Sequence, residues 1–364
     1  MPYPADVRCD YYSAGVCRSC TWLPTAYAEQ LSRKQHTCEQ LIASNRWLSP
    51  VSSRESGFRN KAKLVVGGTP GDVTLGILDQ DLRGIDLRNC GLYEPGLAQA
   101  IPRVADLINA LRLLPYDVNK RRGELKYVHL THSLAGKLMV RFVLRSMQQA
   151  SRITYDAVVT AIPNALVVTL NLQPEHKAVL EGIEEVVLSP TDVLPIPLDH
   201  PVELSPQSFF QTNTAIAQEL YRQAAAWTAV IEPTSVLDAY CGVGGFAFHV
   251  AAPGRHVVGV DVSPGQSRAG VELVAHDALE LAKSTPQADL VVVNPPRRGI
   301  GKMASWLETS KVPNVIYSSC NPTSLAADLR VMASYDVTEA RMFDMFPHTE
   351  HLEVMVLLSR KSNT

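Results

Sequence analysis

The second half of the chain alternates short strands with helices, and this order constrains the fold more than any other feature. Apolar strands are expected at 236–239, 256–260, 290–294, 312–318, 337–343 and 352–358. Helices are expected at 211–230, 264–283 and 322–333, and Thr212 or Asn213 can cap the first of them. Strands joined through helices form a mostly parallel, doubly wound sheet. We therefore predict an α/β domain over residues 205–364.

The first of these strands runs into a glycine-rich turn, DAYCGVGGF, at residues 238–246. Glycines let a backbone pass close to a ligand, and Asp238 can accept hydrogen bonds from an ammonium or hydroxyl group. The next strand ends at Asp261, a carboxylate suited to two ribose hydroxyls. A dinucleotide site would carry GxGxxG. This turn, with an acid at its mouth, instead favours S-adenosylmethionine.

A third feature is Cys320, which ends an apolar run and is followed at once by Asn321 and Pro322. A strand that stops on a thiol presents the sulfur at a loop, where chemistry is usually done. A lone cysteine is by itself more often a small buried hydrophobe. The cofactor turn upstream reverses that balance, so we take Cys320 as a candidate nucleophile and expect Cys241 to pack.

Seven cysteines occur in the chain, an odd number that disfavours a disulfide framework in a protein without an export signal. A zinc ribbon would prefer two CxxC pairs, and one occurs here. Four thiolates in a loop-rich segment suit an iron–sulfur cluster. The candidate ligands are Cys9, Cys17, Cys20 and Cys90. Cys38 lies on an expected helix at 27–42 and is left over.

Between these parts, residues 51–204 carry short alternating runs broken by Gly, Asn and Pro, which predict an antiparallel sheet with a helix near 96–111. The proline-rich stretch 190–206 is the expected boundary. From Arg112 to Arg145 there are eight Lys/Arg against two acids. This asymmetry permits an RNA-facing patch in this central domain, although solvated surface is an equally common cause.

No apolar run approaches the roughly 18 residues that span a bilayer. The N-terminus lacks a basic start followed by an apolar segment, so we expect no secretory signal. We predict a cytoplasmic protein that does not enter a membrane and has no obligatory protein partner.

Several motifs, in order through nearly the whole chain, resemble the RNA (uracil-C5)-methyltransferase family. They are SFFQTN at 208–213, DAYCGVGGF at 238–246, NPPRRG at 294–299, YSSCN at 317–321 and FDMFPHTEHLE at 343–353. Within the family, the chain is most similar to the branch that acts on uridine 747 of 23S rRNA.

The resemblance implies a Rossmann-like S-adenosylmethionine-dependent methyltransferase domain at 205–364, behind a β-rich (α+β) central domain at 51–204. It also implies a [4Fe-4S] cluster on the segment 1–50, held by Cys9, Cys17 and Cys20 with Cys90 as the fourth ligand. The residues expected to contact S-adenosylmethionine are Gln211, Tyr240, Asp261 and Asn294.

The family's chemistry makes Cys320 the nucleophile that attacks C6 of a uracil and Glu353 the base that removes the C5 proton. Glu350 competes for the second role. The 23S rRNA would bring a single-stranded or flipped uridine, because C6 is inaccessible inside a stack. We expect Phe209, Phe210 or Arg297 to hold that base.

Other interpretations remain open. The same chemistry could act on a tRNA uridine or on two rRNA uridines. The chain could be an RNA-binding iron–sulfur protein with a decayed catalytic centre. It could also methylate a nitrogen of a protein or small molecule, with Cys320 idle.

Overall fold

The computed structural model describes residues 7–284 and 288–362. Residues 1–6, from which the lack of a secretory signal was predicted, lie outside these ranges. Within them, no helix combines the length and the apolar character that a membrane crossing needs.

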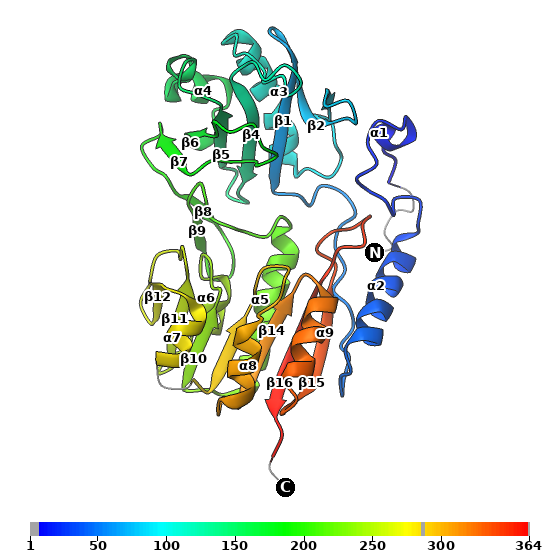
Figure 1. Ribbon diagram of the computed structural model, residues 1–364, viewed down its shortest axis with the longest axis vertical. Helices are drawn as coiled ribbons and strands as arrows, with labels where there is room; N and C mark the ends of the chain where they lie inside the picture. Colours follow the sequence, from blue (N-terminus) through cyan, green and yellow to red (C-terminus); the bar gives the residue numbers. More distant parts are fainter. Residues whose placement is uncertain (1–6, 285–287, 363–364) are drawn as a thin grey trace.

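The first of two large sheets lies at the top of Figure 1 and has the strand order β3-β2-β1-β4-β5-β6-β7. Helices α3 (Pro95–Ala110) and α4 (Tyr155–Ala161) bury one of its faces in an apolar core. Its strands are β1 (Lys61–Thr69), β2 (Asp72–Leu78), β3 (Gly84–Asp86), β4 (Leu125–His132), β5 (Leu138–Leu144), β6 (Ala165–Leu172) and β7 (Glu184–Val187). The expected antiparallel arrangement is wrong at one pair, since β5 and β6 run parallel. The segment between them includes α4, which returns the chain to the same end of the sheet.

The second sheet, below the first in Figure 1, has the order β12-β11-β10-β13-β14-β16-β15. All neighbouring pairs are parallel except those made by β16, which runs against both β14 and β15. Its strands are β10 (Ser235–Ala239), β11 (His256–Asp261), β12 (Val271–Ala275), β13 (Leu290–Val293), β14 (Asn314–Ser319), β15 (Tyr335–Phe343) and β16 (Glu353–Arg360). The mostly parallel, doubly wound sheet predicted for this part of the chain is confirmed.

Helices cover both faces of this second sheet, each over its own apolar core. The helices of one face are α5 (Thr214–Ile231) and α6 (Gly245–Val250), and those of the other are α7 (Ala278–Ser284), α8 (Lys302–Thr309) and α9 (Pro322–Val331). As predicted, Asn213 caps α5, because its side chain accepts a hydrogen bond from the backbone N–H of Ile216 at 3.4 Å. The hairpin β8 (Leu194–Ile196) and β9 (Val202–Leu204) connects the two sheets.

One sequence prediction fails in this sheet. The expected helix at 264–283 is instead a loop, the strand β12 and the short helix α7. Glycines explain the loop: Gly270 has a φ of +82°, and a Cβ on Gly265 would come 3.1 Å from the Cα of Val243 in the glycine turn. The segment therefore packs against that turn, and a helix does not form before β12.

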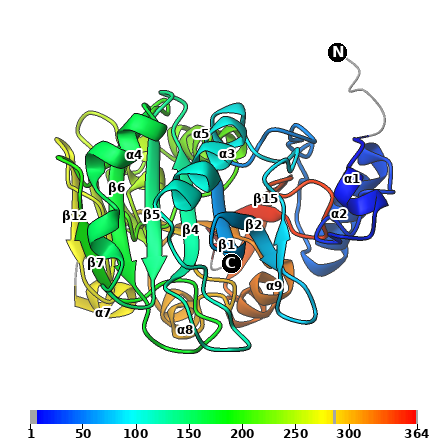
Figure 2. The same ribbon diagram turned by 90° about the horizontal axis from the view of Figure 1, so that it is seen from above.

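The N-terminal segment packs on the second sheet, as both views show (Figures 1 and 2). It contains α1 (Asp10–Ser13) and α2 (Tyr27–Leu41), with α2 lying beside α9 and β15. After α2 the chain makes bridges from Trp47 to Ala340 and from Val51 to Phe343, along the edge strand β15. The beginning of the chain thus adds a layer to the sheet formed by its end.

Candidate active site

The predicted site residues meet at one edge of the second sheet. Asp261 ends β11, Asn294 follows β13 and Cys320 follows β14, so all three lie at the carboxyl ends of parallel strands. Glu353 begins β16, and because β16 runs in the opposite direction its first residue lies at that same edge. The strand order reverses between β10 and β13, and ligands of doubly wound sheets bind at such a point.

The glycines of the turn after β10 have different tasks. Gly242 has a φ of +51° and open space where a Cβ would be, so it leaves room for a ligand. Gly245 instead serves packing, because a Cβ there would come 2.4 Å from the ring of Tyr221 on α5. Cys241 is buried in the core, as expected. The turn is therefore open at Gly242 and packed against α5 at Gly245.

Asp238 lies behind this turn and is fully buried. Its Oδ2 accepts a hydrogen bond from the backbone N–H of Ala247 at 2.9 Å, whereas Oδ1 has no partner among the described residues. Burial, and secondarily the charge of Asp261, raises the pKa of Asp238 to about 8. A buried carboxylate oxygen without a donor is costly, and a cationic or hydroxyl group of a ligand would relieve that cost.

The other predicted cofactor residues surround the same turn. Asp261 accepts the backbone N–H groups of Gly242 at 3.1 Å and Ser263 at 3.0 Å, which orient its carboxylate beside the glycines. Tyr240 is half-buried, with a φ of +65°. Gln211 is buried just before α5 and Asn294 is half-buried after β13. Tyr240, Asp261 and Asn294 therefore lie at the carboxyl ends of neighbouring strands, and Gln211 lies just before the helix that precedes β10.

Cys320 and Glu353 are neighbours across β14 and β16. The antiparallel register pairs Ser319 with Val354, so the next opposed positions are Cys320 and Glu353. Glu353 is 1% exposed, and the hydroxyl of Ser318 donates to its Oε1 at 2.7 Å. Burial raises the pKa of Glu353 to about 7, against the opposing effect of that hydrogen bond. Ser318 was not singled out in the sequence, although it lies within the YSSCN motif.

The pKa of the half-buried Cys320 thiol is also raised, first by burial and then by the charge of Glu353, while Arg297 lowers it. Thiol, carboxyl and guanidinium groups are therefore within electrostatic reach of one another. Glu350, the competing base, is exposed in the preceding loop.

Asp328 of α9 fixes the loop that carries Arg297. Its Oδ2 accepts hydrogen bonds from the hydroxyl of Tyr317 at 2.7 Å and from the backbone N–H of Ile300 at 2.9 Å. A Cβ on Gly299 would come 2.4 Å from the same oxygen, so glycine is needed in the NPPRRG motif. Nothing in the sequence pattern distinguished this aspartate from other helix-surface acids.

The loop that leads to Glu353 is held from below by α2. The ammonium of Lys34 contacts Asp344 Oδ1 at 2.6 Å, with both side chains completely buried, and the hydroxyl of Tyr27 donates to Oδ2 at 2.7 Å. Gln30 accepts the backbone N–H of His348 at 2.8 Å. Sequence reasoning missed this anchor because a lysine on an amphipathic helix is normally exposed.

The four candidate cluster cysteines line one pocket of about 450 Å³ between the N-terminal segment and β1. Burial, and after it the neighbouring Cys90, Cys17 and Cys9, raises the pKa of Cys20 to about 11. Arg59 lines the same pocket, and its buried Nε lacks a partner in the described part of the chain. In residues 7–284 and 288–362, no three His, Cys, Asp or Glu side chains are arranged so that they could hold a metal ion as they stand.

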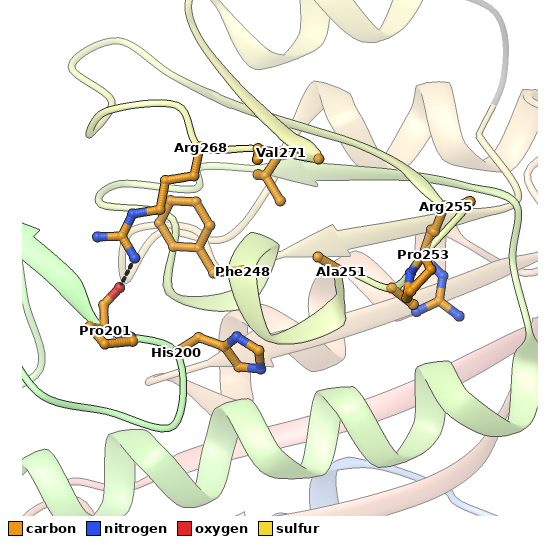
Figure 3. Close-up of a pocket in the computed structure, with 12 residues that line it drawn as sticks. His200, Pro201, Phe248, Ala251, Pro253, Arg255, Arg268 and Val271 are labelled. Atoms are coloured by element: carbon orange, nitrogen blue, oxygen red, sulfur yellow. Dashed lines mark hydrogen bonds between the residues drawn. The ribbon is translucent and has the colours of Figure 1, made fainter.

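A second pocket, of about 410 Å³, lies away from this edge (Figure 3). Arg255 precedes β11 and Val271 begins β12, so the pocket lies at the amino ends of the strands, opposite Asp261. Arg268 lies over the ring of Phe248, 4.6 Å from its centroid, and donates to the carbonyl of Pro201. We assign this pocket no part in the chemistry at the carboxyl edge.

One of the residues predicted to hold the substrate base does not lie where it could do so. Phe210 is 3% exposed and belongs to the core, so it cannot stack on a substrate base. Its neighbour Phe209 is 70% exposed, and Arg297 is also exposed. These two remain available for contact with a base.

Comparison with known proteins identifies relatives along the full length of the chain. The family model described as tRNA (Uracil-5-)-methyltransferase matches residues 279–361. The 23S rRNA (uracil(747)-C(5))-methyltransferase RlmC of Halothiobacillus neapolitanus is 44% identical over 97% of this chain and 100% of its own length. The proteins of that name from Yersinia pseudotuberculosis and Actinobacillus succinogenes are 40% and 39% identical, over 97% and 98% of this chain and 99% and 100% of their own.

A solved structure has the same fold. The crystal structure of Pyrococcus abyssi tRNA (uracil-54, C5)-methyltransferase in complex with S-adenosyl-L-homocysteine is similar with a TM-score of 0.75 and 24% identity, covering 93% of this chain and 85% of that one. The chain has the α/β fold of S-adenosylmethionine-dependent methyltransferases, and by its full-length identity to the curated relatives it belongs to the family of 23S rRNA (uracil(747)-C(5))-methyltransferases.

Proposed function

We propose that this chain is an S-adenosylmethionine-dependent methyltransferase that methylates C5 of a specific uridine in 23S rRNA, the 747-type site for which its relatives are named. The observation that carries the proposal is the pairing of a strand-end thiol, Cys320, with the buried carboxyl of Glu353 at the edge where the cofactor turn lies. Neither a nitrogen methyltransferase nor a decayed enzyme needs that pair.

Uracil C5 is a poor nucleophile, and Cys320 solves this problem by adding to the ring. Its thiolate forms a bond to C6, and the electrons of the C5–C6 double bond move toward C5 and O4. C5 then takes the methyl group that S-adenosylmethionine would supply, and the sulfur–methyl bond breaks to release S-adenosylhomocysteine. Glu353 removes the C5 proton, the C5–C6 double bond re-forms, and the C6–sulfur bond breaks to release the thiolate.

The burial of Glu353 suits the role of base. A carboxyl with a pKa near 7 is present in both forms at neutral pH, so it can accept a proton and return it to water. Ser318 keeps its carboxylate oriented. The exposed Glu350 has no such surroundings, and this difference supports Glu353 as the base.

Gln211, Tyr240, Asp261 and Asn294 are proposed to hold the cofactor in front of Gly242. The unpartnered Oδ1 of Asp238, at the end of the strand that enters this turn, supports a ligand that carries a hydrogen-bond donor. Asp261 retains lone pairs for ribose hydroxyls in addition to its two backbone contacts.

The substrate assignment is tested by incubating the enzyme with S-adenosylmethionine and a fragment of unmodified 23S rRNA that contains the 747 loop. We expect 5-methyluridine at a single position of that loop and none in unmodified tRNA. Methylation of tRNA, or at two rRNA sites, would favour the alternative substrates. The absence of any 5-methyluridine would refute the proposal. The bacterial source of the relatives supports the cytoplasmic location expected from the sequence.

We further propose that Cys9, Cys17, Cys20 and Cys90 hold a [4Fe-4S] cluster on the segment 1–50. Their common pocket supports this ligand set, and four thiolates are the usual donors for such a cluster. We also propose that the chain consists of three parts, namely this segment, the central domain 51–204 and the catalytic domain 205–364. The cluster would connect the chain near Cys9 to the loop at Cys90. Helix α1 already contacts this loop, because the backbone N–H of Asn89 donates a hydrogen bond to the hydroxyl of Tyr11 at 3.2 Å.

Anaerobic purification should therefore yield a brown protein with about four iron and four sulfide per chain. We expect Cys20→Ser to lose most of the iron and Cys38→Ser to keep it, because Cys38 is buried on α2 outside the pocket. Iron and acid-labile sulfide are measured directly, without reference to activity. Stoichiometric zinc in place of iron would contradict the assignment.

A further inference from the structure

A row of polar side chains crosses the first sheet on the face away from its helices. The strand registers pair Lys63 with His129, His129 with Arg141, and Arg141 with Thr169, so β1, β4, β5 and β6 each contribute one residue. Lys61 lies on the same face of β1 as Lys63, since strand side chains alternate. The alternate residues point into the apolar core beneath α3 and α4. Polar residues at such spacing on four strands form one continuous row, in which His129, Arg141 and Thr169 are buried.

This row carries more positive than negative charge. Arg141 is paired by Glu185 through two hydrogen bonds of 2.9 and 2.6 Å. Glu181 contacts Lys63 and a further nitrogen of Arg141, with 3.1 Å from Oε1 to Lys63 Nζ and 2.5 Å from Oε2 to Arg141 Nη1. Three cations thus face two carboxylates.

The pKa of His129 reflects the positive charges around it. Its ring is 1% exposed, and neither ring nitrogen has a hydrogen-bond partner in the described residues. Burial, together with the charges of Lys63 and Arg141, lowers the pKa of His129 to about 3, so the ring is neutral. Burial and Lys63 likewise lower the pKa of Lys61 to about 8. A neutral imidazole without a partner is an unused N–H donor among cations.

Glu181 comes from the irregular segment 173–183, which lies outside the sheet. Its side chain is 36% exposed, whereas that of Arg141 is 3% exposed. The same part of the chain exposes large apolar side chains, namely Val179, Leu180 and Ile183. These side chains add apolar surface beside Glu181.

The segment is connected to the active-site entrance. The carbonyl of Ile183 accepts a hydrogen bond from Gln207 at 3.0 Å. Gln207 belongs to the turn that carries the exposed Phe209 and continues to Gln211. A strand of RNA that reaches the catalytic edge by way of Phe209 can therefore extend toward the row.

We propose that Lys61, Lys63 and Arg141 form a binding site for a backbone phosphate of the substrate RNA, and that Glu181 occupies the phosphate position in the free enzyme. Carboxylate and phosphate oxygens accept the same hydrogen bonds from arginine and lysine, so one can replace the other. A phosphate would also find a donor in His129. Glu185 stays on Arg141 throughout. The inference rests on the proposed RNA substrate.

The RNA phosphate can bind only after Glu181 has left the site. The form with Glu181 displaced is a fraction of the free enzyme, so Glu181 weakens RNA binding. The test measures the dissociation constant of the 23S rRNA fragment by fluorescence anisotropy, at several salt concentrations. Glu181→Gln removes the competing charge, and we expect it to tighten binding about fivefold. Its matched control is Glu175→Gln, which removes an equal charge from the same segment, where Glu175 pairs with Lys177 at 2.7 Å, well exposed.

Lys63→Gln provides a second measurement, which tests the cation and not the displacement of Glu181. We expect weaker binding, with the slope of log K against log salt reduced by about 0.7, the value for one phosphate contact on a single strand. Lys177→Gln is its control. Thermal melting of each variant verifies that it is folded.

Equal affinities for Glu181→Gln and Glu175→Gln, or equal salt slopes for Lys63→Gln and Lys177→Gln, would overturn the site. Formation of 5-methyluridine by the unmodified enzyme is scored separately. If that fails, the proposed function is wrong; if it succeeds while the variants match their controls, the phosphate site alone is wrong.

Discussion

Replacing Cys320 by serine should abolish both methylation and covalent capture of the RNA. The unmodified enzyme, given S-adenosylmethionine and rRNA that contains 5-fluorouridine, is expected to form a complex that survives a denaturing gel, because fluorine cannot leave C5 as a proton does. Cys320→Ser should form none, and turnover on ordinary RNA should fall by about 10⁴-fold or more. A serine hydroxyl keeps its proton at neutral pH and cannot add to C6.

The pH dependence of capture gives a further check. Burial and Glu353 raise the pKa of Cys320, so thiolate and adduct formation should increase through the neutral and alkaline range. Cys241→Ala is the control, because that thiol is buried in the core and should not affect capture. A covalent complex that persists in Cys320→Ser would rule out this thiol as the nucleophile.

Replacing Glu353 by glutamine should separate methyl transfer from release. The amide is close in shape and can still accept the hydrogen bond of Ser318, but it cannot take up the C5 proton. The methylated adduct with ordinary uridine should therefore accumulate on a denaturing gel. We expect turnover to fall by about 10²- to 10⁴-fold, the usual contribution of a general base.

Release in the unmodified enzyme should rise with pH and level off above about 7, because Glu353 must be deprotonated to act and burial raises its pKa to that value. Glu353→Gln should lack this rise. Glu350→Gln removes the exposed competitor and should behave as the unmodified enzyme. If adduct accumulates in Glu350→Gln instead, the base has been assigned to the wrong carboxylate.

The buried pair of Lys34 and Asp344 connects the N-terminal segment to the loop that carries the proposed base, Glu353. A buried charge that loses its partner is strongly unfavourable, so α2 and the loop before Glu353 are held together. The cysteine-rich segment is therefore part of the support of the catalytic edge, through α2, even though Cys9, Cys17 and Cys20 line a different pocket.

Local patterns predicted most of the second sheet, because strands buried on both faces are continuous apolar runs and the helices between them are periodic. The prediction for the stretch 264–283 was wrong because its apolar spacing suits a helix. The left-handed backbone at Gly270 and the contact of Gly265 with the glycine turn are seen only in the folded chain. Likewise, β5 and β6 can be predicted as strands, but their parallel pairing depends on the path of the chain between them.

The sequence by itself determined the order of elements and the residues that end the strands, since these depend on neighbours in the chain. Between Glu350 and Glu353 it favoured Glu353 through the motif resemblance alone. The reversed strand β16 brings Glu353 against Cys320, 33 positions away, and its burial then sets its pKa. The row of Lys63, His129, Arg141 and Glu181 was equally hidden, because its members come from separate strands and a loop. Electrostatic pairing follows distance in space, and the folded chain alone sets those distances.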